Sequence, residues 1–125
     1  MAKKVHDDVL DGALLLVKNN CDRLTVCAGE PASYAEASAG AKYLAGTAMT
    51  TGDFTIGDGA ISGRRAQVAA KSGITVEQNG TVDHIALLDT ANERLLYVTT
   101  CSPQVLTAGN SLTVNSWSIE IADPA

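Results

Sequence analysis

Few residues of this chain are of a type and spacing that could do chemistry. His84 follows Asp83 in a run typical of a β-strand, and Cys27 or Cys101 could meet its ring across strands. An imidazole beside a thiol can remove the thiol proton, which is how cysteine nucleophiles are activated. The alternative is a histidine whose ring nitrogens are satisfied by polar neighbours. The sequence does not show that ring and thiol meet, and the chain contains no other motif that carries chemistry, so we predict a non-enzymatic protein without catalytic residues or cofactors.

Two aspartates beside glycines, Asp53 and Asp58, are candidates for a metal site, because Asp-Gly segments can bind calcium. The residues around them lack the series of oxygen ligands and the final glutamate of a calcium loop. We therefore predict that this segment binds no metal.

The cysteines indicate the compartment in which the chain is made. Cys21, Cys27 and Cys101 form an odd set without a C-x-x-C spacing, which is typical of proteins made in a reducing cytoplasm. Cys27 and Cys101 could form a disulfide across strands, or they could remain free and buried.

Composition limits the size and the partners of the protein. A chain of 125 residues with 46% hydrophobic and 4% aromatic residues suits a single domain, residues 1–125, with a core of aliphatic side chains. The net charge of −5 and the lack of long basic runs argue against a nucleic-acid partner. The longest wholly apolar run is residues 13–17, so we predict neither export nor a membrane span.

The first element is an amphipathic helix, expected within residues 1–20. Apolar residues recur every three or four positions from residue 5 to residue 17, and the acidic start and basic end suit the helix dipole. So broad an apolar face either covers the β core of the same chain or docks a partner. In both cases Val9, Leu14 and Leu16 are expected to contact the core or a neighbouring subunit.

Residues 21–51 are expected to contribute a strand and a loop. Polar and apolar residues alternate over residues 22–27, as in a half-buried strand. The remainder is rich in Ala, Ser and Gly, so we expect a loop with one weak strand near residues 43–49. This segment could instead lie over a neighbouring subunit, and Tyr34 and Tyr43 are its candidate contact residues.

Residues 52–125 are expected to form the β core, because short β-type runs alternate with compact turns. The runs are residues 52–56, 64–71, 74–77, 81–89, 94–101, 104–106, 112–114 and 117–121. Gly80 is expected at positive φ in a tight hairpin turn, and the strands of the core are expected to form an antiparallel meander. The predicted fold is mainly β: a small antiparallel β-sandwich or barrel with one N-terminal amphipathic α-helix. Trp117 would plug one end of the core or anchor an interface.

Several motifs, in order along nearly the whole chain, resemble a family of small virion proteins of tailed bacteriophages. They include residues 5–14 (VHDDVLDGAL), 52–56 (GDFTI), 69–73 (AAKSG), 80–89 (GTVDHIALLD) and 117–121 (WSIEI). The resemblance implies a structural protein without catalytic residues, present in many copies on the particle.

The first hypothesis is a head decoration, or cement, protein that is made in the host cytoplasm and binds the outer capsid surface. Its partners would be the major capsid protein and copies of itself, arranged as trimers at local three-fold sites. The second hypothesis is a component of the neck, tail or tail fibre. The third is a small carbohydrate-binding module or enzyme that uses the region around His84.

Overall fold

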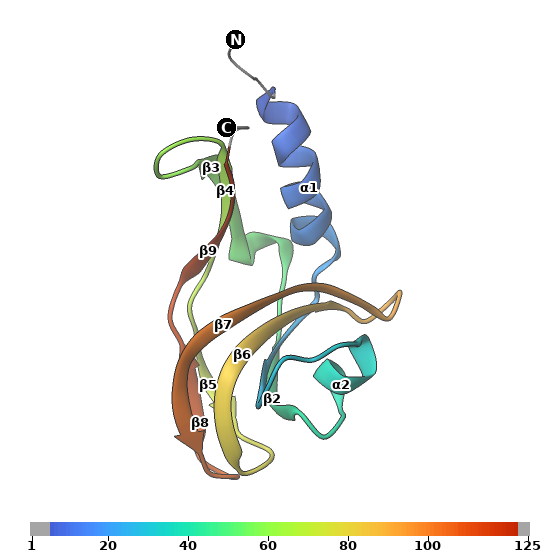
Figure 1. Ribbon diagram of the computed structural model, residues 1–125, viewed down its shortest axis with the longest axis vertical. Helices are drawn as coiled ribbons and strands as arrows, with labels where there is room; N and C mark the ends of the chain where they lie inside the picture. The colour runs from blue at the N-terminus through green and yellow to red at the C-terminus, as the bar shows by residue number, and fades with distance from the viewer. Residues whose placement is uncertain (1–5, 123–125) are drawn as a thin grey trace.

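Residues 6–122 are described in the computed structural model of this chain, and they form antiparallel sheets flanked by helices (Figure 1). In chain order the elements are α1 (Asp7–Asn20), β1 (Arg23–Cys27), α2 (Tyr34–Ser38), β2 (Tyr43–Ala48), the 3-10 helix η1 (Thr51–Asp53), β3 (Phe54–Asp58), β4 (Arg64–Val68), β5 (Lys71–Thr75), β6 (Gly80–Asp89), β7 (Arg94–Leu106), β8 (Ser111–Val114) and β9 (Trp117–Ile121).

The strands form three open sheets that pack around a main apolar core, and a smaller buried cluster includes Ala37 of α2. Their orders are β2-β1-β6-β7, β3-β4-β9 and β5-β8, and every pairing is antiparallel. Leu24 of β1, Phe54 of β3, Val68 of β4 and Leu87 of β6 are almost fully buried in this core. The predicted class is confirmed as a mainly β, sandwich-like protein with an N-terminal helix, and no sheet closes into a barrel within the described residues.

The predicted meander is wrong, because half of the strand pairings join segments far apart in the chain. β1 pairs with β6, β4 with β9 and β5 with β8. The early strand β1 is therefore flanked on both sides in the four-stranded sheet. In Figure 1 the long, curved β6–β7 hairpin crosses the molecule. Helix α2 lies beside this hairpin in the lower part of the view, and α1 lies at the top.

The segment expected as a loop contains the short helix α2. Ser33 Oγ accepts a hydrogen bond from the Glu36 backbone N–H at 3.3 Å, and a Glu36 carboxylate oxygen accepts one from the Ala32 N–H at 3.0 Å. Such reciprocal bonds satisfy N–H groups at the start of a helix that have no partner inside it. The Ser-x-x-Glu spacing at 33–36 was the sequence feature that could have predicted α2. The expected weak strand is present as β2, and its first three residues are buried.

Gly80 is not at positive φ, so the predicted hairpin turn is wrong. It begins β6, whereas the preceding strand β5 pairs with β8. A Cβ at Gly80 would lie 2.8 Å from a methyl carbon of Leu44, so close packing favours glycine here. In contrast, Gly109 in the turn before β8 has a φ of 92°, which agrees with the turn predicted at 108–110.

β7 is one strand where two runs were expected. It continues through Pro103, and its register against β6 shifts between the pairs His84 with Thr100 and Val82 with Gln104. Proline has no N–H for a sheet ladder, but β7 is at the edge of its sheet, where that loss is tolerated.

Candidate interaction surface

The inner face of α1 fixes the helix on the core. Leu10, Leu14 and Val17 follow a spacing of four and three residues, and all three are buried. His6 caps the helix, with its Nδ1 accepting a hydrogen bond from the Asp8 N–H at 3.0 Å. The predicted amphipathic helix is thus present, although Val5 lies outside the described residues.

Polar contacts also hold α1 against the three-stranded sheet. Arg64 of β4 donates from Nε to Asp11 at 2.8 Å and from Nη1 to Asp58 at 2.7 Å. Lys18 Nζ donates to the carbonyl oxygen of Phe54 at 2.8 Å. The pKa of Arg64 is raised further above its usual high value, first by the hydrogen bond to Asp11. The contacts of Asp11 and Lys18 fix which side of α1 faces outward.

The outer face of α1 is apolar as well. Val9 is 67% exposed, Leu16 is 46% exposed and Leu15 is 40% exposed. Val9 and Leu16 are seven residues apart and therefore lie on one side of the helix, two turns from each other. Leu14 is buried inside the molecule. Of the three predicted contact residues on α1, two are thus available to a partner.

An apolar groove lies beside this outer face, with a volume of about 360 Å³. Leu16 of α1, Leu96 and Tyr97 of β7, and Ile119 and Ile121 of β9 are among its lining residues. We call it the apolar groove. It lies where an exposed side chain of α1 meets the line along which β7 faces the last two strands, β8 and β9; we call this line the seam.

An aromatic pair lies further along the same seam. The rings of Tyr97 and Trp117 are stacked, with centroids 6.0 Å apart and planes at 24°. Trp117 is half-buried, and its indole nitrogen is a buried polar atom without a hydrogen-bond partner among the described residues. Trp117 packs against the main apolar core, which agrees with the first of its two predicted roles, the plug at one end of the core.

Beyond the aromatic pair is a second cavity, of about 430 Å³, which we call the polar cleft. Its wall is made from the second half of β7 and from the chain of β8 and the start of β9. The apolar groove and the polar cleft therefore both open between β7 and the last two strands.

The region around His84 is a set of polar contacts between β6 and the loop after β1. His84 Nδ1 is 2.8 Å from Asp83 Oδ1, and the same oxygen accepts the Gly29 N–H at 2.7 Å. These two bonds lower the pKa of the Asp83 carboxyl, the His84 contact most. Nδ1 of His84 thus has a polar neighbour, and the bond from the Gly29 N–H to Asp83 ties the loop after β1 to β6.

The sheet register places Cys27 opposite His84. The Cys27 thiol is fully buried and contacts the Thr25 hydroxyl, with a sulfur to oxygen distance of 3.9 Å. Burial raises its pKa, so the thiol stays protonated near neutral pH, whereas nucleophilic attack requires the thiolate. Cys27 and Cys101 are both free thiols, so the alternative of a disulfide is not realised.

The two tyrosines predicted as contact residues, Tyr34 and Tyr43, contact other residues of the same chain. Tyr43 is buried, donates to a carboxylate oxygen of Glu77 and accepts from Arg23 Nη2 at 2.8 Å. Tyr34 of α2 packs against a small buried cluster that includes Cys27. Neither forms a patch with the outer face of α1.

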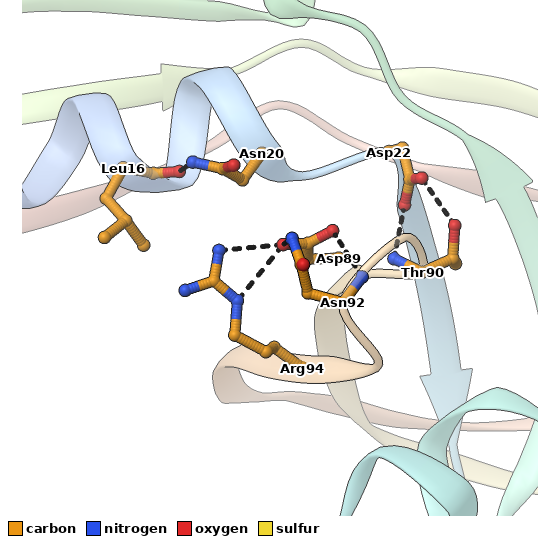
Figure 2. A network of polar contacts seen from close by, with 7 residues as sticks. All are labelled: Leu16, Asn20, Asp22, Asp89, Thr90, Asn92 and Arg94. Carbon is orange, nitrogen blue, oxygen red and sulfur yellow. Dashed lines mark hydrogen bonds and ion pairs between the residues drawn. The ribbon is translucent and has the colours of Figure 1, made fainter.

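Sequence reasoning missed a carboxylate network at the tip of the β6–β7 hairpin (Figure 2). Buried Asp89 accepts from Arg94 Nη2 and from Asn92 Nδ2, both at 2.8 Å, and Asp22 accepts the Thr90 N–H at 2.9 Å. The bonds from Asn92 and Arg94 lower the pKa of Asp89. An aspartate followed three residues later by asparagine is a turn pattern that could have indicated part of it.

Asp53 and Asp58, the candidate calcium residues, are bound to Lys71 and Arg64 respectively. In the described part of the chain, no three His, Cys, Asp or Glu residues are grouped so as to hold a metal ion. No helix in that part is long and apolar enough to cross a membrane.

Comparison of the chain with protein-family models, with curated proteins and with solved structures finds no match.

Proposed function

We propose that this chain is a non-enzymatic structural protein of a tailed bacteriophage virion, and specifically a head decoration protein that binds the outer capsid surface. The observation that carries the proposal of a docking role is the outer face of α1. Val9 and Leu16 are exposed on a helix whose other apolar face is already buried. Exposed apolar side chains next to a groove are typical of protein interfaces.

The geometry favours a partner that is a folded protein. The apolar groove can receive one or two apolar side chains of a partner, while Leu16 at its edge inserts into the partner in return. α1 is fixed by the ion pair of Asp11 with Arg64 and by its buried inner face, so little ordering of the helix is required on binding.

The virion as the setting rests on the sequence resemblance, and the proposed partners are the major capsid protein and copies of this chain. A ring of three copies would bury the outer faces of α1 without leaving an open-ended interface. Averaged density over the capsid lattice of intact particles, in clusters of three, is the expected image. Density confined to the tail axis would place the protein in the neck or tail instead.

The docking role is tested by charge substitutions on the outer face of α1. Particles are purified from cells that make Leu16→Asp or Val9→Asp in place of the natural chain, and the bound protein is quantified by mass spectrometry. We expect at least about tenfold less protein on the particle, because an aspartate would be desolvated at the interface. Thermal unfolding of each free variant verifies its fold.

Val105→Asp is the matched control. Val105 is 77% exposed, but it lies on β7 where that strand pairs with the start of β6, away from α1. This variant should assemble normally. Full incorporation of both α1 variants would refute the docking role of α1.

A further inference from the structure

We infer that the polar cleft is a binding site for a neutral saccharide. The cleft is formed by the second half of β7 facing β8 and the chain that leads into β9. Its volume of about 430 Å³ falls in the range of small-molecule sites. This inference is independent of the proposed docking role of α1, which uses the other end of the seam.

The floor and the rim of the cleft differ in chemistry. The floor consists of buried aliphatic side chains: Val26, Val82, Ile85, Leu112 and Val114. The rim carries exposed hydroxyl and amide side chains, among them Thr100, Ser102, Gln104, Thr113, Asn115 and Ser118. A sugar ring has the same division, with apolar C–H faces and hydroxyl groups around its edge.

Among residues 6–122, no side chain with a formal charge lines the cleft. The chain as a whole has 23 acidic and basic residues, from 14 Asp and Glu plus 9 Lys and Arg, so an uncharged lining of this size is a distinct feature. A phosphate, carboxylate or ammonium group entering the cleft would lose water without gaining an ion pair. The lining therefore selects a neutral ligand with several hydroxyl groups.

Trp117 supplies two further features of a saccharide site. Its ring lines the cleft and is held in place by stacking on Tyr97. Its indole N–H is buried and lacks an acceptor among the described residues, which is unusual for a buried tryptophan. A ligand hydroxyl oxygen that reaches this buried nitrogen when the ligand binds would accept the bond and remove the cost of leaving the donor unpaired.

The rim side chains are free to bind a ligand. No hydrogen bond found among the described side chains uses the hydroxyl groups of Thr100 and Thr113 or the amides of Gln104 and Asn115. They are also placed on both walls, since two belong to β7 and two to β8 and the chain after it. A ligand can therefore be bound from two sides.

The test uses Trp117 as a reporter, because it is the single tryptophan of the chain. Intrinsic fluorescence is followed during titration with maltose, lactose, cellobiose and glucose, and with glucuronate as the charged counterpart of glucose. We expect a saturable change with at least one neutral sugar, and affinity for glucuronate about tenfold below that for glucose. Saturation by an uncharged Ser- and Thr-rich peptide but by none of the sugars would overturn the inference, as would no saturable change with any neutral sugar at millimolar concentration.

Two variants examine the site by calorimetry with the sugar that binds best. Trp117→Phe retains an aromatic ring but lacks the N–H, and Thr113→Val removes a rim hydroxyl at constant shape; each should weaken binding about tenfold. Thr75→Val is the control, because Thr75 is an exposed threonine on β5, the strand paired with β8, and does not line the cleft. Unchanged affinity in both cleft variants, or an equal loss in the control, would overturn the assignment.

Discussion

The two ends of the seam between β7 and the last two strands have opposite chemistry. At one end, α1 covers the seam and leaves an apolar groove lined by leucine and isoleucine side chains. At the other end, no helical residue of the described chain lines the polar cleft, and hydroxyl and amide groups surround it. The stacked rings of Tyr97 and Trp117 lie between the two.

This difference shows how one strand can serve two surfaces. β7 contributes Leu96 and Tyr97 to the apolar groove and Thr100 and Gln104 to the polar cleft. Its register shift near Pro103 lies in the polar half. An apolar surface beside a helix suits a protein partner, whereas an uncharged polar cleft suits a small hydroxylated ligand.

The largest effect is expected where the groove joins the core. Leu14→Asp places a charge at a position that is 1% exposed, so we expect a loss of at least about 4 kcal/mol in the free energy of unfolding. Urea denaturation measures this. Leu14→Met is the matched control and should cost less than about 1.5 kcal/mol. A stable, folded Leu14→Asp protein would contradict the packing of α1.

The next effect concerns the aromatic pair that separates the two ends. Trp117→Ala removes a half-buried ring and its stacking on Tyr97, so we expect a loss of about 2 kcal/mol in the free energy of unfolding. Thermal melts followed by circular dichroism measure it. An unchanged melting temperature would contradict a contribution of the stacked rings of Tyr97 and Trp117 to the stability of the fold.

A smaller effect is expected on the outer face of α1. Leu16→Asp should change the free energy of unfolding by less than about 1 kcal/mol, because the side chain is half exposed before any partner binds. Paired with Leu14→Asp under the same denaturation conditions, it separates the two faces of one helix. Equal destabilisation by the two substitutions would remove that distinction.

The smallest effect is a pH dependence near the polar cleft. Burial raises the pKa of Cys101 in the cleft wall, and the charge of Asp83 adds to this rise. The pKa of Asp83 itself is lowered by its hydrogen bonds to His84 and the Gly29 N–H. A lowered carboxyl pKa stabilises the fold fully above the ordinary value of 3.8, and this stabilisation is lost as the pH falls below that value toward the folded-state pKa. Asp83→Asn should therefore flatten the acid side of the stability profile, measured by urea midpoints. A profile identical to that of the natural chain would show that the hydrogen bonds of Asp83 to His84 and to the Gly29 N–H do not contribute to the free energy of unfolding.

Local patterns along the chain predicted most of the elements. The period of the apolar residues indicated α1, and the alternation near Leu24 and Val26 indicated β1. The period left open whether Leu14 contacts the core of its own chain or a neighbouring subunit, because a period shows that a face is apolar without showing which protein covers it. The structure buries Leu14 in the core of its own chain. The capping signature of α2, Ser-x-x-Glu at residues 33–36, is a sequence feature that indicates the start of a helix.

The apolar groove and the polar cleft could not be predicted from the sequence. Each combines β7 with residues of β9 or β8, and only the pairing of β4 with β9 and of β5 with β8 brings those segments to the seam. These pairings depend on which long-range contacts bury the most apolar surface together, a property of the whole chain.

The sequence by itself determined the β-rich class, the helix and the absence of large aromatic side chains from most of the core, because these follow from residue type and local period. The tertiary structure alone decided the strand order, the outward position of Val9 and Leu16, and the place of Trp117 between two cavities. The physical reason is that local propensity acts over a few residues, whereas burial and strand pairing act between residues of any separation.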